Sequence, residues 1–387
     1  ERGRNVVLFD RREPGRETSF GNAGIIQTEA VLPYAIPLSF GRLSRIALGT
    51  AHDVTWSPRS MAAWIDPVAR YFWHSLPAHY ARIIPQYARL ILRAAEDHEP
   101  LIAASGSADL IRRSGFIQAY RSMRRFDAAQ REAETIRSDF GVPYAALDGP
   151  GLAAIEPDLR VSMSGAIHYT SPLSCTDPGE LVARYARLFV ARGGQVQTAE
   201  IGGIEPRGSG WTMRTSAGAL ETPEVVVTLG PWSPKLLAPL GYRIPMVFKR
   251  GYHQHFRAAA MPNQPIMDVE NSVVLSQMRA GLRVLTGAEL NSVEGSANLR
   301  QMRHAANIAK LLYPVVDEAD SPPWRGARPC MPDMLPVIGP ASRHKGLWFN
   351  FGHGHQGFTL GPTSGALLAN AMDGIGDSSA LKPYARY

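Results

Sequence analysis

A short apolar segment that ends at an acid opens the chain and limits the folds that it can adopt. The sequence begins ERGRNVVLFDRR, in which residues 1–4 are expected to close a helix and residues 5–9 to form a strand ending at Asp10. The continuous apolar run VVLF is typical of a parallel strand that is buried on both faces. An acid that closes the second strand of a βαβ unit binds the ribose of a dinucleotide. A solvated acid after an ordinary strand is the equally weighted alternative.

The dinucleotide interpretation requires a glycine fingerprint at a position that the printed sequence does not reach. The motif GxGxxG should lie roughly 20 residues before the acid, which places it ahead of residue 1. The stretch GHGHQG at 352–357 has this spacing but lies far downstream of Asp10, so it does not replace the missing turn. We therefore expect that the numbered chain lacks the first strand and the phosphate-binding turn of the unit.

The composition favours a globular protein of two domains that binds small molecules. A chain of 387 residues with 45% hydrophobic and 19% charged residues is too long for one simple core. The net charge of +7 comes from scattered Arg and Lys residues, which argues against nucleic acid and fits small anions. Cys175 and Cys330 are too few for a disulfide framework and suit a reducing cytoplasm. No run of 18 apolar residues predicts a membrane span.

Helix and strand patterns alternate along the chain in an order that predicts an interrupted α/β domain. Helical patterns are expected within 56–105, where Pro85 should kink the helix or begin a new one, and over 124–139, 181–192 and 298–314. Strand patterns dominate 244–290. The final segment reads as a strand (347–351), a glycine loop (352–357) and a helix (361–372). The predicted domains are 1–50, 150–240 and 320–387 for nucleotide binding, and 51–149 with 241–319 for the substrate.

Four short stretches have residue types that suit a bound ligand. The glycine loop at 352–357 precedes a helix start, where backbone N–H groups favour an anion or an electron-rich edge. The stretch VVVTLGPW reads as a buried strand that turns at Gly230, and TSFGNAGII offers small residues for close approach. In WRGARPCMP, Arg328 lies on a stiff segment and could bind a carboxylate bidentately, although a surface ion pair is the commoner role of an Arg.

Together the four stretches resemble the flavin-dependent D-amino-acid oxidase superfamily, and most closely its bacterial D-amino-acid dehydrogenase small-subunit branch. The resemblance covers nearly the whole chain. It implies an α/β fold with a Rossmann-like FAD-binding domain and a second α+β substrate domain, as in D-amino-acid oxidase and glycine oxidase. The residues that it assigns to non-covalent FAD are Asp10, Arg11, Arg12, Thr18, Ser19, Asn22, Ala23, Gly24, Ile25, Ile201, Gly230, Trp232, Gly352, His353, Gly354, Gln356, Gly357, Phe358 and Thr359.

The resemblance also implies catalytic roles. Arg328 matches the arginine that binds the substrate carboxylate, Tyr252 a tyrosine that faces the substrate, and His255 is the further candidate. Cys330 is expected to be a buried thiol rather than a flavin attachment site. The motif contexts of His253, His255, His353 and His355 are better explained by the flavin site and by strand packing, so no metal is predicted.

The implied reaction is oxidation of a small D-amino acid or proline-like amino acid by hydride transfer from Cα to flavin N5. The product imine hydrolyses to a keto acid, or remains cyclic for a proline-like substrate. One alternative is a glycine- or sarcosine-type oxidase that uses O2, and another is an inactive flavoprotein partner subunit. The electron acceptor, quinone or O2, is left open. The expected location is the cytoplasm, with peripheral association with the inner face of the membrane as an option.

Overall fold

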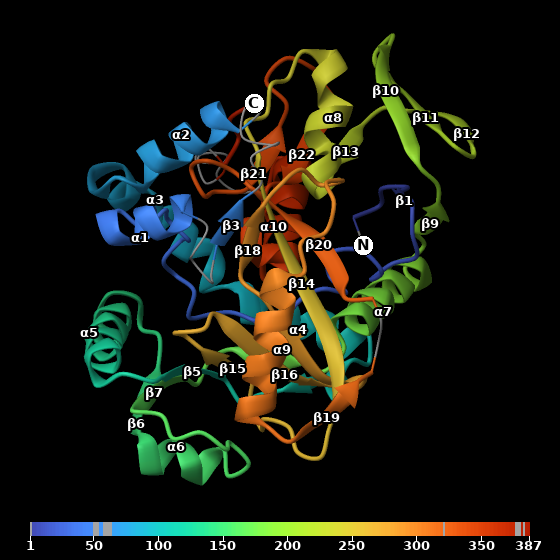
Figure 1. Cartoon of the computed structure of the whole chain (residues 1–387). Coiled ribbons are helices and arrows are strands. Elements are labelled where there is room, and N and C mark those ends of the chain that lie inside the picture. The colour runs from blue at the N-terminus through green and yellow to red at the C-terminus, as the bar shows by residue number, and fades with distance from the viewer. Residues whose placement is uncertain (1, 49–53, 57–63, 320–321, 376–380, 382–383) are drawn as a thin grey trace.

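The structure, a computed structural model, describes residues 2–48, 54–56, 64–319, 322–375, 381 and 384–387 (Figure 1). Within these residues, one large mixed sheet is accompanied by smaller sheets and by helices that cover them. The strands of the large sheet are β3 (Val54–Trp56), β5 (Phe116–Tyr120), β6 (Tyr144–Asp148), β7 (Gly165–Tyr169), β14 (Val247–Ala258), β15 (Ile266–Asp268), β16 (Val273–Met278), β17 (Gly281–Leu285), β18 (Ala288–Leu290), β19 (Val315–Glu318) and β20 (Trp324–Cys330). Their order is β3-β18-β14-β17-β16-β15-β5-β7-β6, and β19 and β20 also pair with β14.

The smaller sheets come from segments at the start, middle and end of the chain. Their strands are β1 (Val7–Asp10) with β9 (Gln195–Thr198), β13 (Val225–Val227) with β22 (Leu347–Phe351) and β21 (Val337–Pro340), β10 (Ile201–Arg207) with β11 (Gly210–Thr215) and β12 (Gly218–Thr222), and β2 (Ile25–Ile26) with β8 (Leu173–Cys175) and β4 (Ile111–Arg112). The pairs β1–β9 and β13–β22 are parallel, which is the pairing expected of a nucleotide-binding domain.

The described helices follow the predicted regions closely. They are α1 (Phe40–Ala47), α2 (Ile65–Ser75), α3 (Pro77–Ile91), α4 (Ala94–Ala104), α5 (Met123–Phe140), α6 (Gly149–Ile155), α7 (Pro178–Ala191), α8 (Ser233–Leu237), α9 (Arg300–Leu312) and α10 (Gly357–Met372). The predicted helices at 56–105, 124–139, 181–192 and 298–314 are thereby confirmed in the described residues. None of the described helices is both long and apolar enough to cross a membrane.

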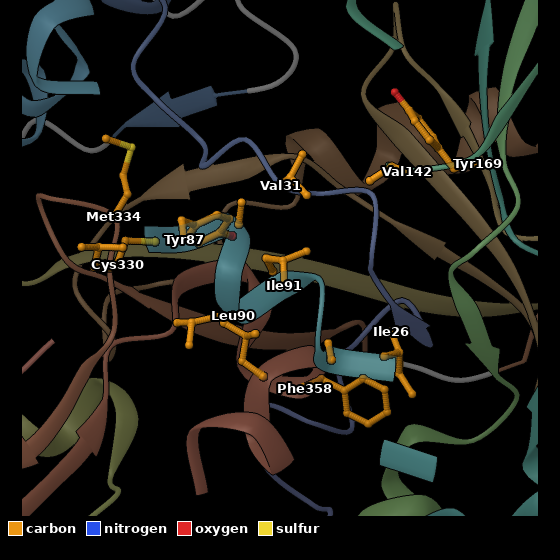
Figure 2. Packing of buried hydrophobic residues seen from close by; sticks show 14 of the residues in the cluster. Ile26, Val31, Tyr87, Leu90, Ile91, Val142, Tyr169, Cys330, Met334 and Phe358 are labelled. Atoms are coloured by element: carbon orange, nitrogen blue, oxygen red, sulfur yellow. The ribbon is translucent and has the colours of Figure 1, made fainter. Parts of the chain in front are cut away.

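One hydrophobic core joins the ligand-binding segments to the helices at the centre of the molecule. Figure 2 shows Tyr87, Leu90 and Ile91 of α3 gathered with Ile26 from β2 and Phe358 from α10. All five side chains are buried. Because this packing fixes the start of α10 against β2, two stretches that are more than 330 residues apart hold one position relative to each other.

Several local predictions are wrong, and each has a structural reason. Residues 2–4 are not helical, because Gly3 has a φ of +72° and the flanking Arg2 and Arg4 extend to Asp373. The predicted strand is not buried on both faces: Val6, just before β1, and Leu8, within β1, are 44% and 43% exposed, since β9 is the only partner strand of β1 in the described part of the chain.

Two further helix predictions can be compared with the structure. Helix α3 runs through Pro85 without starting again there, which excludes a new helix at this proline and leaves the predicted kink as the alternative. Helix α10 begins at Gly357 and not at residue 361, so the glycine loop before it is shorter than predicted. The predicted domain boundaries remain a prediction, and those near residues 50 and 320 fall among residues outside the described ranges.

Candidate active site

A single large cavity lies where the segments with the predicted motifs meet. It has a volume of about 1240 Å³, which is ample for an extended cofactor together with a small substrate. The predicted site residues that line it are Thr18, Ser19, Asn22, Ala23, Ile25, Gly230, Tyr252, Arg328, His353, Gly354, Gly357 and Phe358. The others do not line it: Asp10, Arg11, Arg12, Gly24, Ile201, Trp232, His255, Gly352, Gln356 and Thr359.

The parallel strands β13 and β22 end at one wall of this cavity. The chain leaves β13 through Gly230, with a φ of +52°, and leaves β22 through Gly352 and Gly354, with φ values of +81° and +59°. Only glycine adopts such angles without strain, so these turns bring the backbone close to the cavity. The start of α10 follows at once and adds backbone N–H groups that favour negative charge. Ligands in such folds bind at the carboxyl ends of the parallel strands, and this wall has that position.

Two half-buried polar side chains on this wall each have one buried atom that lacks a hydrogen-bond partner. Neither the Nε2 atom of His353 nor the Oδ1 atom of Asn350 forms a hydrogen bond with any of the described residues. Burial lowers the pKa of His353 to about 4, so its ring is neutral at pH 7. Leaving such groups unpaired costs free energy, which a ligand with matching polar atoms would recover.

Some of the predicted nucleotide residues that do not line the cavity form a second group around the end of β1. Asp10 ends β1, its Oδ1 accepts the backbone N–H of Arg12 at 3.1 Å, and burial raises its pKa. The guanidinium carbon of Arg11 lies 3.9 Å from the centre of the Trp232 ring. The backbone oxygen of Asp10 accepts the N–H of Ala199, two residues before Ile201. The structure therefore brings the Asp10, Ile201 and Trp232 segments together, as the sequence predicts.

A second wall, which adjoins the first where Cys330 pairs with His353, is formed by β14 and β20, which are antiparallel. Arg328 is part of strand β20, so the short, stiff segment predicted for it is a β-strand. Its guanidinium lies over Gly251, where a Cβ atom would be 2.7 Å from both Nη atoms. The Nη1 atom of Arg328 is buried and has no hydrogen-bond partner among the described residues. Burial lowers the pKa of Arg328, and no described carboxylate pairs with it.

The other two predicted catalytic side chains are engaged elsewhere. The hydroxyl of Tyr252 donates to the carboxylate of Glu289, which also pairs with the fully buried Arg250. The Nε2 atom of His255 accepts from Arg283 Nε at 3.0 Å, and His255 does not line the cavity. These contacts support structural roles, so neither residue is carried into the function proposed below.

Sequence reasoning missed several polar residues that line the cavity. Glu29 is 4% exposed, its Oε1 accepts from Gln27 Nε2 at 2.6 Å, and its buried Oε2 has no partner among the described residues. Burial raises the pKa of Glu29 to about 7. Gln27 is itself held by Gln356, whose Nε2 donates to Gln27 Oε1 at 2.8 Å. The sequence feature that could have indicated Glu29 is the presence of an acid within the largely apolar run IIQTEAVL.

Lys249 is the other missed residue. It lines the cavity, and its Nζ donates to the hydroxyl of Tyr71 at 2.8 Å. Burial lowers the pKa of Lys249.

Cys330, predicted to be a buried thiol, is free and buried, and burial raises its pKa. No group of three described His, Cys, Asp or Glu side chains could hold a metal ion.

Comparisons with known proteins agree on one family. The family model described as FAD dependent oxidoreductase matches residues 1–371. A D-amino acid dehydrogenase of Cereibacter sphaeroides is 30% identical, over 96% of this chain and 87% of the relative. A D-amino-acid oxidase of Bradyrhizobium diazoefficiens is 27% identical, over 99% of this chain and 92% of the relative.

Solved structures share the fold at lower identity. Glycine oxidase from Geobacillus kaustophilus has a TM-score of 0.75 and 19% identity, over 99% of this chain and 92% of that one. Iminodiacetate oxidase from Chelativorans sp. BNC1 has a TM-score of 0.72 and 20% identity, over 99% and 93%. The predicted α/β fold of the D-amino-acid oxidase and glycine oxidase type is thereby confirmed.

Proposed function

The chain belongs to the FAD dependent oxidoreductase family, and on that premise we propose that it oxidises a small amino acid whose carboxylate is bound by Arg328. FAD-dependent oxidation of an amino acid at a CH–NH2 or CH–NH group is the activity common to the family members described above. The finer proposal concerns the substrate, a D-amino acid or a proline-like amino acid, and the residues that bind it. The unpaired, buried guanidinium of Arg328 in the cavity is the observation that carries the proposal.

The residues present fit FAD. The cavity is large enough, the glycine turns after β13 and β22 let the backbone approach a ligand, and His353 and Asn350 offer unpartnered polar atoms. These turns and the start of α10 would hold the flavin end, while Asp10 and its neighbours would hold the nucleotide end. When bound, FAD supplies the oxidant that takes a hydride from the substrate Cα.

The protein's own residues bind and orient the substrate. Arg328 presents a planar fork that matches a carboxylate, and that fork lies over Gly251 of β14, which has no side chain to cover it. Holding the carboxylate fixes the direction of the Cα–H bond, which is the larger part of what a flavin site must provide. The amine must be neutral when hydride leaves, so that the product is an imine that water hydrolyses to a keto acid and ammonia.

The test is anaerobic reduction of the FAD-loaded protein by a panel of D- and L-amino acids, with proline included. We expect loss of the oxidised flavin absorbance with one or more small amino acids and little loss with the matching amines, which lack a carboxylate. Repeating turnover with O2 and with a quinone identifies the electron acceptor. Equal reduction by amino acids and amines, or no reduction by any of them, would contradict the proposal.

A further inference from the structure

The register of β14 and β20 places two cationic residues side by side on the cavity wall. Lys249 is the direct cross-strand partner of Arg328. Both line the cavity, so both side chains extend from the same face of the strand pair. Residues paired in this way have Cβ atoms about 5 Å apart, and like charges at such positions are destabilising unless an anion lies near them.

The two charged groups have different neighbours. The Arg328 guanidinium lies over Gly251, two residues further along β14. The Lys249 Nζ lies 4.3 Å from the ring centre of Tyr71, on α2, and donates to its hydroxyl. That hydroxyl in turn donates to the backbone oxygen of Tyr34, which fixes its orientation. The ammonium therefore has two N–H groups left for a ligand.

No acid in the described part of the chain neutralises either charge. Neither residue forms an ion pair with a described carboxylate, although both are buried or half-buried. Cys330 lies nearby, but burial raises its pKa, so it is a neutral thiol at pH 7. His355 is also close, and burial followed by the charge of Arg328 keeps its pKa well below the ordinary value. The cavity wall thus carries two positive charges without a counterion from the protein.

We infer that Lys249 binds a second acidic group of the substrate, so that the preferred substrate is an amino acid with two carboxylates. This inference rests on the proposed function, because it assumes that Arg328 binds the first carboxylate. The two charged groups have different neighbours, Gly251 for Arg328 and Tyr71 for Lys249, so each can bind a carboxylate of its own. A side-chain carboxylate next to Lys249 would use both positive charges and both of the free ammonium donors.

The kinetic experiment uses FAD-loaded wild type, Lys249→Met and a control, Lys310→Met, which removes an exposed charge on α9. The substrates are glutamate and its neutral isostere glutamine, in the enantiomer that reduces the flavin faster. In the wild type, kcat/KM should be at least tenfold higher for glutamate. Lys249→Met should lower kcat/KM for glutamate by ten- to a hundredfold and change that for glutamine less than twofold, while Lys310→Met changes neither.

Losses of equal size for glutamate and glutamine in Lys249→Met would overturn the inference, as would a wild type that does not prefer glutamate. A second experiment, which measures ligand binding without catalysis, distinguishes failure of the two-carboxylate inference from failure of the proposed function. Glutarate should raise the unfolding temperature of the wild-type protein more than butyrate does, and Lys249→Met should abolish the difference. If no amino acid reduces the flavin, the proposed function is wrong, and the glutarate result alone then decides whether the two-cation site exists. Equal effects of glutarate and butyrate would overturn it.

Discussion

The two walls of the cavity present different chemical groups to a ligand, backbone groups on one wall and charged side chains on the other. The wall at the ends of β13 and β22 is glycine-rich backbone with positive φ angles, whereas the wall formed by β14 and β20 carries two charged side chains, Lys249 and Arg328, whose positions are set by strand register. The first wall offers N–H groups to any electron-rich ligand edge, and the second selects a ligand by the number and position of its negative charges. The difference separates cofactor binding from substrate recognition, and the variants below act on one wall at a time.

The largest effect is expected on the charged wall. Arg328→Lys keeps the positive charge but loses the fork that binds a carboxylate through two parallel hydrogen bonds. Breaking such a buried pair costs about 2–5 kcal/mol, or roughly thirty- to several-thousandfold in kcat/KM. Steady-state kinetics with the best substrate measure the loss. FAD content should stay unchanged, and a protein that loses its flavin instead would assign Arg328 to the cofactor wall.

Glu29 should make stability depend on pH. Its pKa is about 7 in the folded protein and near 4.5 when unfolded, so the folded state holds an extra proton between these values. Stability therefore falls as pH rises from 4.5 to 7, and the cost is fully present at pH 8. At about 1.4 kcal/mol for each pH unit, Glu29→Gln should stabilise the protein by up to about 3 kcal/mol at pH 8.

Denaturant unfolding of wild type and Glu29→Gln at pH 5 and pH 8 measures this effect. The gain should shrink strongly at pH 5, because Glu29 is then protonated in the folded wild type. Glu96→Gln, at an exposed position on α4, serves as the control and should give no such difference. A gain of the same size at both pH values would show that packing and not charge is responsible.

On the cofactor side, Asp10→Ala should weaken FAD binding. The carboxylate at the end of β1 would accept hydrogen bonds from the ribose hydroxyls, worth about 1.5–3 kcal/mol for a charged acceptor. FAD titration should show a Kd that is roughly ten- to a hundredfold higher, and kcat at saturating FAD should be little changed. An unaltered Kd would indicate that Asp10 is a solvated acid that does not contribute to FAD binding.

A smaller effect is expected from Gly251→Ala. The added methyl group would meet the Arg328 guanidinium at 2.7 Å and push it from its position. Because a small displacement of a group that binds the substrate can lower the reaction rate strongly, kcat/KM should fall roughly tenfold while FAD affinity is unchanged. Gly41→Ala is the matched control, because a Cβ there has no neighbour within 4 Å. Equal activity of the two variants would mean that Arg328 does not depend on Gly251.

The cofactor wall was predictable from the sequence, and the substrate wall only in part. The strand, glycine loop and helix at 347–372 form one continuous motif, so their local pattern was sufficient, apart from the early start of α10 at Gly357. Lys249 was missed because its place opposite Arg328 depends on the register of two strands 79 positions apart. The exposure of Leu8 on β1 was missed because an apolar run does not reveal how many strands flank it.

The central claim is that Arg328 binds the substrate carboxylate, and the most direct test is a double cycle on the rate of flavin reduction. Wild type and Arg328→Lys are each mixed with an amino acid and with its amide, in which the carboxylate is replaced. The account predicts a large loss for the acid in Arg328→Lys and a much smaller loss for the amide, because the amide offers no anion to bind. Equal losses for acid and amide would contradict the account and would place the carboxylate elsewhere in the cavity.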